Sequence, residues 1–581
     1  MVDSSETVGK FNYITHETIV PPITDGRDNQ AHKVAICGGG PVGFAIALGL
    51  ARQGMSSVVL EADNTVCVGS RAACISRRSL EILEQLGVAD AFLAKGLAWT
   101  TGRSYYRDRE ILEFHMNDDG NQKFPPMINL QQYYIEQILV DELDKYRDLV
   151  DIRWGNTVTA IEQSQDRTTV SVRAGNTDYI LEADWLVAAD GGRSFVRQHF
   201  DLPMHGTVHN GRFVIIDIEL ESSSPTERRA WFDPAARPGS TMLMHRQPDN
   251  IWRIDYLVED HVSDEEALKE ENVLPVVEKF LEAIGETGSW KPVWISMYNA
   301  KALALDEFRL DRIIFAGDAA HIVPIFGVRG LNGGFDDAYN LAWKLALVAK
   351  GAAAPALLDS YASERHGAFL TNGAAASKSA EFMSPINNSA KLMRDAVLSL
   401  IEQRPEMASL VNPRQTQPIR YKGSPLNTPD SRPFNGKLPD VGEPLRESIL
   451  KSASFPSIKY MTDLLDGHSF LLLIFESKGD LRYLDGLKTT TVAGLPIRVA
   501  RISNAESPDA FHDPTGKVRS QYGAAEGAGF LVRPDGHVCA RWLDIRSTGI
   551  DAIIGAANLA CALPTGATKN TEKHKEGLAD A

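Results

Sequence analysis

The stretch from Ala35 to Glu61, AICGGGPVGFAIALGLARQGMSSVVLE, constrains the fold of this chain most. An apolar run leads into a glycine-rich turn, a helical pattern follows, and a second apolar run ends in an acid. Gly38, Gly40 and Gly43 form G-x-G-x-x-G, in which glycines permit a tight turn, close approach of a pyrophosphate and close packing of helix on strand. In this order of elements, the pattern predicts a dinucleotide-binding βαβ unit.

The ends of this unit supply further candidate contacts to a dinucleotide. Pro41 and Val42 begin the helix, whose unpaired N–H groups and positive dipole end attract a phosphate. Glu61 and Ala62 follow the second strand, where a carboxylate can accept a hydrogen bond from a ribose hydroxyl. A glycine-rich turn in an ordinary α/β unit is the alternative interpretation.

Composition and charge indicate an enzyme and exclude several other classes. The 581 residues include 60 Lys and Arg against 76 Asp and Glu, a net charge of −16 that argues against nucleic-acid or anionic-membrane binding. No apolar run approaches the ~20 residues of a membrane span, and no secretory signal pattern is present. The five cysteines contain no C-x-x-C, so we expect a cytoplasmic protein with neither disulfides nor a metal site.

Three more candidate cofactor contacts lie outside the βαβ unit. Arg71 occupies a loop of small residues, where its guanidinium can neutralise a pyrophosphate. Gln132 lies at the start of a predicted helix and can bond a cofactor or simply face water. Asp190 and Gly191 follow a short apolar run, at the edge where parallel sheets bind ligands. A simple turn of Asp and Gly is the alternative there.

A second strand, turn and helix pattern spans Arg312 to Gly351. The strand ends before an acid, a Pro/Gly loop follows, and helical spacing of alanine and leucine extends to about Lys350. The N-terminal dipole of this helix can stabilise negative charge on a cofactor. Trp343 is expected to pack in the core, and His321 to be a hydrogen-bonded loop residue. The candidate cofactor contacts here are Gly317, Asp318, Pro324, Gly330, Leu331 and Asn332.

Residues 213–259 consist of short alternating strands separated by Pro, Gly and Asp. This pattern predicts an antiparallel sheet inserted into the α/β framework. Alternation places Arg253 and Asp255 on one face of a strand and Tyr256 on the other. Either face can meet a ligand.

Together these motifs resemble the single-component FAD-dependent aromatic hydroxylases, the class A flavoprotein monooxygenases. The resemblance extends from about Lys33 to Arg365. Ala319 to Pro324 and the helix NLAWKLALVAKG are most similar to the 3-(3-hydroxyphenyl)propionate hydroxylase and phenol hydroxylase branch. The motifs are Gly38-x-Gly40-x-x-Gly43 with Glu61, Arg71, Asp190-Gly191 with Ser194 and Arg197, and Gly317-Asp318 with Asn332, Asp337 and Asn340 to Lys344.

Two departures fall in the loop that the resemblance places beside the reacting edge of the flavin. Pro324-Ile325 stands where the family often has two prolines. Val328-Arg329-Gly330 stands where the family often has Gly-Gln-Gly.

The resemblance implies a reaction and its cofactors. NADH or NADPH reduces FAD in a transient encounter, O₂ adds at flavin C4a, and the hydroperoxide hydroxylates a phenol. A 3-(3-hydroxyphenyl)propionate-like phenol of aromatic-compound catabolism is the expected substrate, and a homodimer is a family-level expectation. The alternatives are a hydroxylase of a larger polycyclic or polyketide phenol, a non-hydroxylating FAD oxidoreductase and a flavin-dependent binding protein.

The substrate is expected between the inserted sheet and the flavin. The pocket candidates are His245, Arg253, Tyr256 and Tyr298, which can recognise a phenolate or a side-chain carboxylate. Sheet packing or solvent exposure is an equal alternative for each. The acid or base that activates the phenol stays unassigned.

The expected fold is α/β, with a Rossmann-like FAD-binding domain, an inserted antiparallel-sheet substrate domain and a C-terminal thioredoxin-like domain. Residues 33–425 form the first two, after a flexible arm at 1–32. The FAD-binding parts are 33–110, 130–200 and 303–370, and the substrate-binding sheet is 203–302.

The C-terminal domain is expected at residues 426–564, before a disordered tail at 565–581. Residues 531–536, LVRPDG, are especially similar to the thioredoxin-like domain of larger aromatic hydroxylases. Without C-x-x-C, thiol redox work is not expected, and a role in assembly or in capping the core is favoured. Cys539 is expected to pack within a strand.

Overall fold

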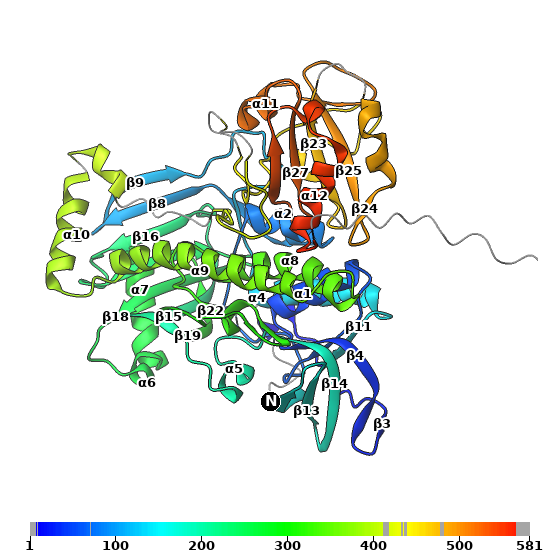
Figure 1. The fold of residues 1–581 in the computed structure, drawn as a ribbon. Helices are drawn as coiled ribbons and strands as arrows, with labels where there is room; N and C mark the ends of the chain where they lie inside the picture. The colour runs from blue at the N-terminus through cyan, green and yellow to red at the C-terminus, as the bar shows by residue number, and fades with distance from the viewer. Residues whose placement is uncertain are drawn as a thin grey trace, which may run out of the picture.

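The computed structural model describes residues 7–8, 10–69, 71–401, 403–410, 417–430, 434, 439–476 and 481–564. The predicted tail at 565–581 lies outside the described residues. In Figure 1, helices α8 (Gly330–Ala349) and α9 (Ala356–Met383) cross the middle of the molecule, between two sheet regions below and the C-terminal domain above.

A large mixed sheet carries the glycine turn. Its strands follow the order β11-β5-β4-β14-β13-β12, with β3, β20 and β21 joined at the side. β4 is parallel to β5 and β14, and β14 is parallel to β21, so residues that follow these strands meet at one edge. The strands are β3 (Ile23–Thr24), β4 (Arg27–Cys37), β5 (Ser57–Leu60), β11 (Val150–Arg153), β12 (Asn156–Gln163), β13 (Thr168–Ala174), β14 (Thr177–Ala188), β20 (Arg309–Leu310) and β21 (Ile313–Phe315).

Helices pack against this sheet and form the main core with it. Helix α1 (Pro41–Arg52) lies close to α8, because Gly49 and Ala342 face each other and a Cβ on Gly49 would lie 2.7 Å from that of Ala342. A small sheet of β6 (Cys74–Ser76), β10 (Met127–Asn129) and β7 (Leu97–Trp99) lies beside them. The other helices of this part are α2 (Arg77–Gln85), α3 (Ala89–Lys95), α4 (Gln132–Leu143) and α5 (Phe195–His199). Helix α10 (Asn388–Ile401) packs instead against the inserted sheet (Figure 1).

The inserted sheet has the order β22-β19-β15-β18-β17-β16-β8-β9. One face packs on helix α7 (Glu270–Ala283), where the Trp231 and Phe280 rings meet edge to face at 4.9 Å. α6 (Asp264–Ala267) precedes α7. The strands are β8 (Thr101–Tyr106), β9 (Arg109–His115), β15 (His205–Leu220), β16 (Arg228–Phe232), β17 (Thr241–Arg246), β18 (Ile251–Val258), β19 (Trp290–Ala304) and β22 (His321–Ile322).

Two sequence-based boundaries differ from the structure. Residues 101–110, predicted within the FAD-binding part, belong with β8 and β9 to the inserted sheet, where β8 pairs in parallel with β16. Such pairing between distant segments has no local sequence signal. Of the predicted flexible arm at 1–32, residues 10–32 instead pack on the domain, since Phe11 is buried with its ring 4.7 Å from Tyr133, and β4 already begins at Arg27. β1 (Thr7–Val8) pairs with β2 (Phe11–Asn12).

The C-terminal domain has the strand order of a thioredoxin-like unit. β23 is parallel to β25 on one side and antiparallel to β27 on the other, and β27 is antiparallel to β28. Cys539 is buried in β28, and burial raises the pKa of its thiol to about 12, as expected of a packing residue. The elements are β23 (Phe470–Phe475), β24 (Thr491–Val492), β25 (Leu495–Ser503), β26 (Phe511–His512), α11 (Lys517–Tyr522), β27 (Ala528–Val532), β28 (Val538–Trp542) and α12 (Ile550–Ala560).

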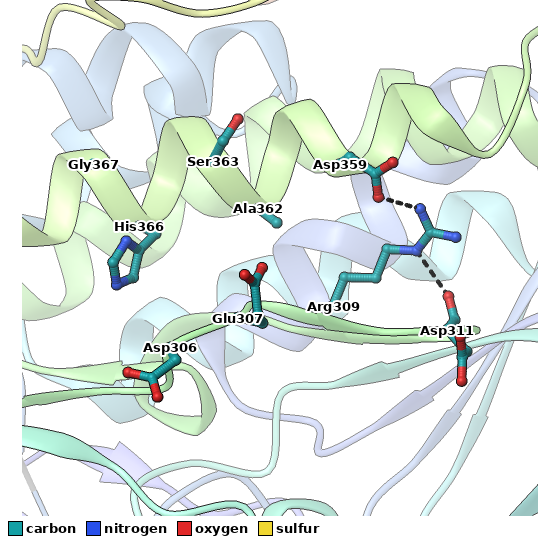
Figure 2. Close-up of a pocket in the computed structure, with 9 residues that line it drawn as sticks. All are labelled: Asp306, Glu307, Arg309, Asp311, Asp359, Ala362, Ser363, His366 and Gly367. Atoms are coloured by element: carbon teal, nitrogen blue, oxygen red, sulfur yellow. Dashed lines mark hydrogen bonds and ion pairs between the residues drawn. The ribbon is translucent and has the colours of Figure 1, made fainter.

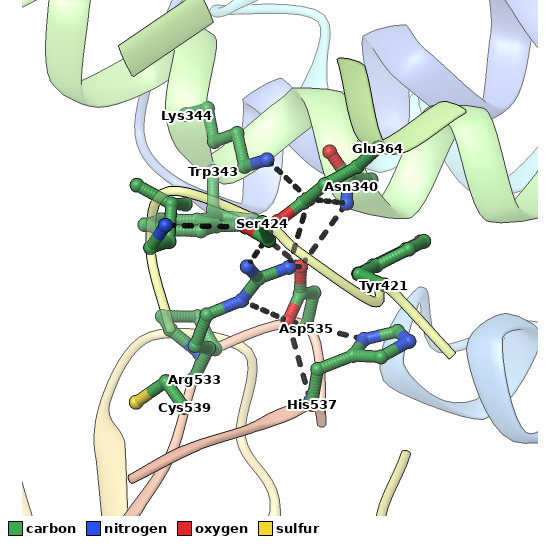
Figure 3. Close-up of polar contacts among 12 residues, drawn as sticks. Asn340, Trp343, Lys344, Glu364, Tyr421, Ser424, Arg533, Asp535, His537 and Cys539 are labelled. Carbon is green, nitrogen blue, oxygen red and sulfur yellow. Dashed lines mark hydrogen bonds and ion pairs between the residues drawn. The ribbon is translucent and has the colours of Figure 1, made fainter. Parts of the chain in front are cut away.

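A network of buried charges joins this domain to α8 and α9 (Figure 3). Arg533 donates to both oxygens of Glu364 at 2.6 and 3.1 Å, and Lys344 Nζ donates to Glu364 at 2.7 Å. Asp535 accepts from Arg533 at 2.5 Å and from the buried indole of Trp343 at 3.3 Å. The four charged side chains are at most 1% exposed. Although burial favours the neutral acid, Arg533 and Lys344 hold the pKa of Glu364 well below its usual range.

Glu364→Gln tests this network. The substitution leaves Lys344 and Arg533 buried with one carboxylate fewer, so we expect the free energy of unfolding in urea to fall by about 3–5 kcal/mol. Asp178→Asn is the matched control, because it breaks an ion pair with Arg173 in which both side chains are at least 60% exposed. Its expected effect is below about 1 kcal/mol. Equal losses in the two variants would contradict a special role for the buried network.

Candidate functional site

The glycine turn lies at the carboxyl end of β4. Gly38 has φ +102°, and a Cβ there would lie 2.6 Å from the carbonyl oxygen of Ala189. A Cβ on Gly43 would lie 2.0 Å from the carbonyl oxygen of Gly38, so helix and strand approach closely. Nothing lies within 4 Å of the position of a Cβ on Gly40. Gly38 and Gly43 therefore shape the turn, and the space in front of Gly40 is open.

Two helix N-termini point their unpaired N–H groups toward this edge. α1 begins at Pro41 and α8 at Gly330, and neither has a side-chain cap. Val42 packs between them, because a Cβ on Gly334 would lie 2.5 Å from its side chain. The two positive dipole ends give the edge an affinity for negative charge.

Glu61 closes the turn from the neighbouring strand. Its Oε2 accepts from the N–H of Gly39 at 2.6 Å, and its Oε1 accepts from the N–H of Asp63 at 2.8 Å. Burial raises the pKa of Glu61. A carboxylate offers about four acceptor positions, so both oxygens can still accept from a hydroxyl. Ala62 is exposed beside it.

Two acids from β14 and β21 meet at the same edge. Asp190 Oδ2 accepts from the N–H of Val196 at 3.1 Å, while its buried Oδ1 has no partner among the described residues. The side chain of Asp318 is exposed, and Arg71 and Arg197 lie near enough to attract its negative charge. The glycines beside these acids have positive φ: Gly191 at +77° and Gly317 at +58°.

Gln132 and Glu136 fix the loop that carries Arg71. Gln132 Oε1 accepts from the N–H of Ala72 at 3.1 Å, and its Nε2 donates to Glu136 at 2.9 Å. Glu136 also accepts from the N–H of Cys67 at 2.6 Å, and burial raises its pKa to about 7. Both ends of the Gln132 amide are thus engaged within the protein, and its contact with a cofactor stays a prediction.

Asn332 joins the start of α8 to the start of α2. Its Oδ1 accepts from the N–H of Ser76 at 2.8 Å and from the hydroxyl of Ser79 at 2.6 Å. Its Nδ2 donates to the carbonyl of Cys74 at 3.0 Å. The side chain predicted to contact a cofactor therefore orders the two helix starts around the site.

His321 is hydrogen-bonded, as expected, but it lies in the short strand β22, paired with Ala304, and not in a loop. Its Nε2 lies 2.7 Å from Asp337 Oδ2, and both side chains are buried. Asp337 also accepts from the N–H of Gly317 at 2.9 Å and from Arg365 Nε at 2.5 Å. Against the effect of burial, His321 and Arg365 hold the pKa of Asp337 well below its usual range. The sequence motif includes Asp337 without indicating this role.

The four pocket candidates do not share one face of the inserted sheet. Arg253, His245 and Tyr298 lie on the face that meets the cofactor domain, as the strand pairings and alternation require. Tyr256 lies on the opposite face, packed in the cluster against α7, with the Arg237 guanidinium 4.9 Å from its ring. The structure therefore does not bring Tyr256 together with the other three.

Arg253 joins the sheet to the Arg71 loop. Its Nε and Nη2 donate to the two carboxylate oxygens of Asp217 at 2.9 and 3.1 Å, and its Nη1 donates to the backbone oxygen of Arg71 at 3.1 Å. The charge of Arg253 is therefore already compensated. His245 is buried beside it, and desolvation together with two neighbouring arginines lowers the pKa of His245 well below its usual value.

Tyr298 holds the loop around Pro324. Its hydroxyl accepts from the N–H of Ile325 at 2.9 Å and donates to the carbonyl of Val323 at 3.3 Å. Further along, Val328 has φ +59°, a left-handed conformation that β-branched residues rarely adopt. Val328 stands where the family that the sequence resembles often has glycine, so the backbone here is strained.

A hollow of about 590 Å³ lies elsewhere, between α9 and the β20 turn (Figure 2). Its lining is acid-rich, with Asp306, Glu307, Asp311 and Asp359, and Arg309 is paired with Asp359 at 2.5 Å. It contains none of the predicted site residues. Within the described ranges, no group of three or more His, Cys, Asp or Glu side chains could hold a metal ion, and no helix is long and apolar enough to cross a membrane.

Known proteins match both the sequence and the fold. A family profile described as FAD binding domain matches residues 31–370. The 3-(3-hydroxy-phenyl)propionate/3-hydroxycinnamic acid hydroxylase of Mycolicibacterium smegmatis is 25% identical over 517 residues, 87% of this chain and 89% of that protein. The 6-methylpretetramide 4-monooxygenase of Streptomyces rimosus is 27% identical over 563 residues, 93% of this chain and 95% of that protein.

A similar solved structure is that of the flavin-dependent monooxygenase PieE in complex with FAD and substrate. It superposes with a TM-score of 0.79 at 20% identity, over 92% of this chain and 100% of that chain. At this level of identity the match bears on the fold alone.

Val328→Gly tests the strain in the loop. A left-handed residue costs about 1–2 kcal/mol without glycine, and glycine loses about 0.5–1 kcal/mol through the entropy of the unfolded chain. We expect V328G to raise the free energy of unfolding by between about 0 and 1.5 kcal/mol. Val208→Gly, at an exposed strand position without positive φ, is the control and should lose about 1 kcal/mol. Equal losses would show that Val328 is not strained in solution.

Proposed function

We propose that this chain, which belongs to the FAD-dependent flavoprotein monooxygenase family, hydroxylates a small phenol with NADH or NADPH as electron donor. The observation that carries the proposal is the polar face of the inserted sheet around Arg253. From this face Arg253 donates a hydrogen bond to the backbone oxygen of Arg71, in the loop of the cofactor-binding part. That face lies where a substrate would sit between the inserted sheet and the cofactor edge. The 3-(3-hydroxyphenyl)propionate-like phenol is the favoured substrate, because relatives named for that activity reach 30% identity over 355 residues, against 27% for the relative named for a polyketide.

The cofactor edge fits FAD on its own features. The space before Gly40, the uncapped helix starts and the partnerless Oδ1 of Asp190 suit a ligand with a pyrophosphate and hydroxyl groups. When bound, FAD supplies the activation of O₂ that hydroxylation needs. We assign the pyrophosphate to the turn and α1, the adenosine ribose to Glu61, and the flavin to the start of α8. The proposed contacts are Gly38, Gly40, Pro41, Val42, Gly43, Glu61, Ala62, Arg71, Gln132, Asp190, Gly191, Gly317, Asp318, Pro324, Gly330, Leu331 and Asn332.

The protein's own part is to position the phenol and exclude water. Phe213, Leu243 and Phe326 belong to an apolar cluster on the cofactor-facing side of the sheet, and Tyr298 ties the Pro324 loop to that cluster. Such a surface can hold an aromatic ring while the closed loop keeps water from the reacting atoms. Arg253, held in place by Asp217, joins the sheet to the cofactor domain through its hydrogen bond to the backbone oxygen of Arg71.

A larger polyketide phenol is the second candidate substrate. The relative named 6-methylpretetramide 4-monooxygenase aligns with 93% of this chain, more than the phenylpropionate hydroxylase does. A panel of substrates that includes a polycyclic phenol separates the two candidates.

The decisive experiment is oxidation of NADH and of NADPH in air by the FAD-loaded protein. We expect 3-(3-hydroxyphenyl)propionate to stimulate the rate and to yield a product heavier by one oxygen atom, detected by mass spectrometry. Stimulation and product with a polycyclic phenol only would replace the small phenol by the second candidate. Oxidation that no phenol stimulates would contradict the hydroxylase proposal.

Gly40→Ala tests the placement of the pyrophosphate. A Cβ at Gly40 meets no protein atom, so the fold should persist, but the methyl group would occupy the space proposed for the phosphates. We expect FAD to bind at least about 10-fold more weakly, a loss of about 1.4 kcal/mol, measured by flavin fluorescence. Gly367→Ala is the matched control: a Cβ there also meets nothing, within helix α9, and FAD affinity should be unchanged. Equal affinities for wild type and G40A would contradict the placement.

A further inference from the structure

The cofactor-facing side of the inserted sheet holds a charged residue for which the local sequence gives no signal. Arg228 begins β16 and lies directly across from His245 on β17, which lies across from Arg253 on β18. Paired residues on neighbouring strands point to the same face. Arg228, His245 and Arg253 therefore form a row that faces the cofactor domain, and Arg228 is close enough to Cys74 on β6 to lower the pKa of that thiol against the effect of burial.

Arg228 differs from Arg253 in having no partner. Among the described residues, no hydrogen bond or ion pair is formed by its half-buried side chain. Arg253, in contrast, is fully compensated by the carboxylate of Asp217. A half-buried guanidinium has five donors, and with no acceptor from the protein those of Arg228 are available to an anionic ligand.

Two neighbours of Arg228 are also incomplete. His245 is 6% exposed, and its buried Nδ1 has no hydrogen-bond partner in the described part of the chain. Asp255 is 4% exposed, and its Oδ1 likewise has none. Burial raises the pKa of Asp255 to about 6, with Arg253 and Arg228 opposing the shift. Buried polar atoms are almost always satisfied, so these two buried partnerless atoms beside the unpaired guanidinium of Arg228 point to a ligand there.

Building on the hydroxylase function proposed above, we propose that Arg228 binds a carboxylate of the aromatic substrate, with His245 as its neighbouring hydrogen-bond donor. The substrate class is then a phenol that carries a carboxylic acid.

The surroundings favour a carboxylate on the Arg228 side of the face. A guanidinium matches the two oxygens of a carboxylate with two parallel donors. Two acids share this face: Asp217 is neutralised by Arg253, and Asp255 lies on β18 beyond β17, so it repels an anion less than Arg228 attracts it. Between the two, Leu243 and Ala230 supply an apolar floor for the ring. A phenol with its acid at Arg228 and its ring on this floor uses each feature.

The test compares an acid with its uncharged counterpart. The FAD-loaded protein is assayed with 3-(3-hydroxyphenyl)propionate and with the corresponding amide, and kcat/KM is measured for each. Arg228→Met keeps most of the unbranched apolar stem of the side chain and removes the charge. We expect the ratio of kcat/KM for acid over amide to fall at least about 10-fold, mainly through KM. Arg228→Lys should recover part of the preference, because it restores the charge without the fork.

Arg229→Met is the matched control. Arg229 is the next residue, points to the opposite face and pairs with Glu227 at 3.5 Å, so its loss should leave the acid-to-amide ratio unchanged. An unchanged ratio in R228M, or an equal fall in R229M, would overturn the assignment.

A separate measurement keeps the outcome clear if the protein turns over neither phenol. Binding of the acid and of the amide to the FAD-loaded protein is then followed by the change in flavin absorbance. A preference for the acid that R228M abolishes would support the carboxylate site even though the proposed substrate has failed. Absence of any acid preference in the wild-type protein would overturn it.

Discussion

The carboxylate of Asp337 is the point on which the arrangement of the site depends. It accepts from the backbone N–H of Gly317 after β21 and from Arg365 on α9, and it is hydrogen-bonded to His321 on β22. One buried anion thus fixes the end of β21, the short strand β22 and helices α8 and α9 relative to one another. Because His321 and Arg365 both stabilise its charge, the carboxylate stays ionised despite complete burial. The position of the α8 N-terminus, and with it the proposed flavin site, follows from this anchor.

Helix α8 makes ordering contacts at both of its ends. At its start, Asn332 links it to α2, and the loop before it is tied to the inserted sheet by Tyr298. Two turns beyond Asp337, Lys344 enters the buried network with Glu364 and Arg533. The cofactor edge, the inserted sheet and the C-terminal domain are therefore connected through one element, helix α8.

Sequence alone predicts what is local and misses what is assembled from distant segments. The G-x-G-x-x-G turn, the alternation that separates Arg253 from Tyr256 and the long α8 pattern all arise from neighbouring residues, and the structure agrees with them. The pairing of β8 with β16 joins segments more than 120 residues apart. The ion pair between Arg253 and Asp217 likewise depends on the register of two strands, which local periodicity does not fix.

The C-terminal domain lacks a redox motif, but the buried network makes it a structural part of the cofactor-binding region. Glu364 and Lys344 belong to helices of the cofactor-binding part, while Arg533 and Asp535 come from the other domain. A chain shortened at residue 425 would expose the charged side chains of Lys344 and Glu364 and the indole of Trp343 to water on α8 and α9. The two parts therefore share one buried, charged interface. A swap of the C-terminal domain between relatives would succeed only where the interface charges of both parts are exchanged together.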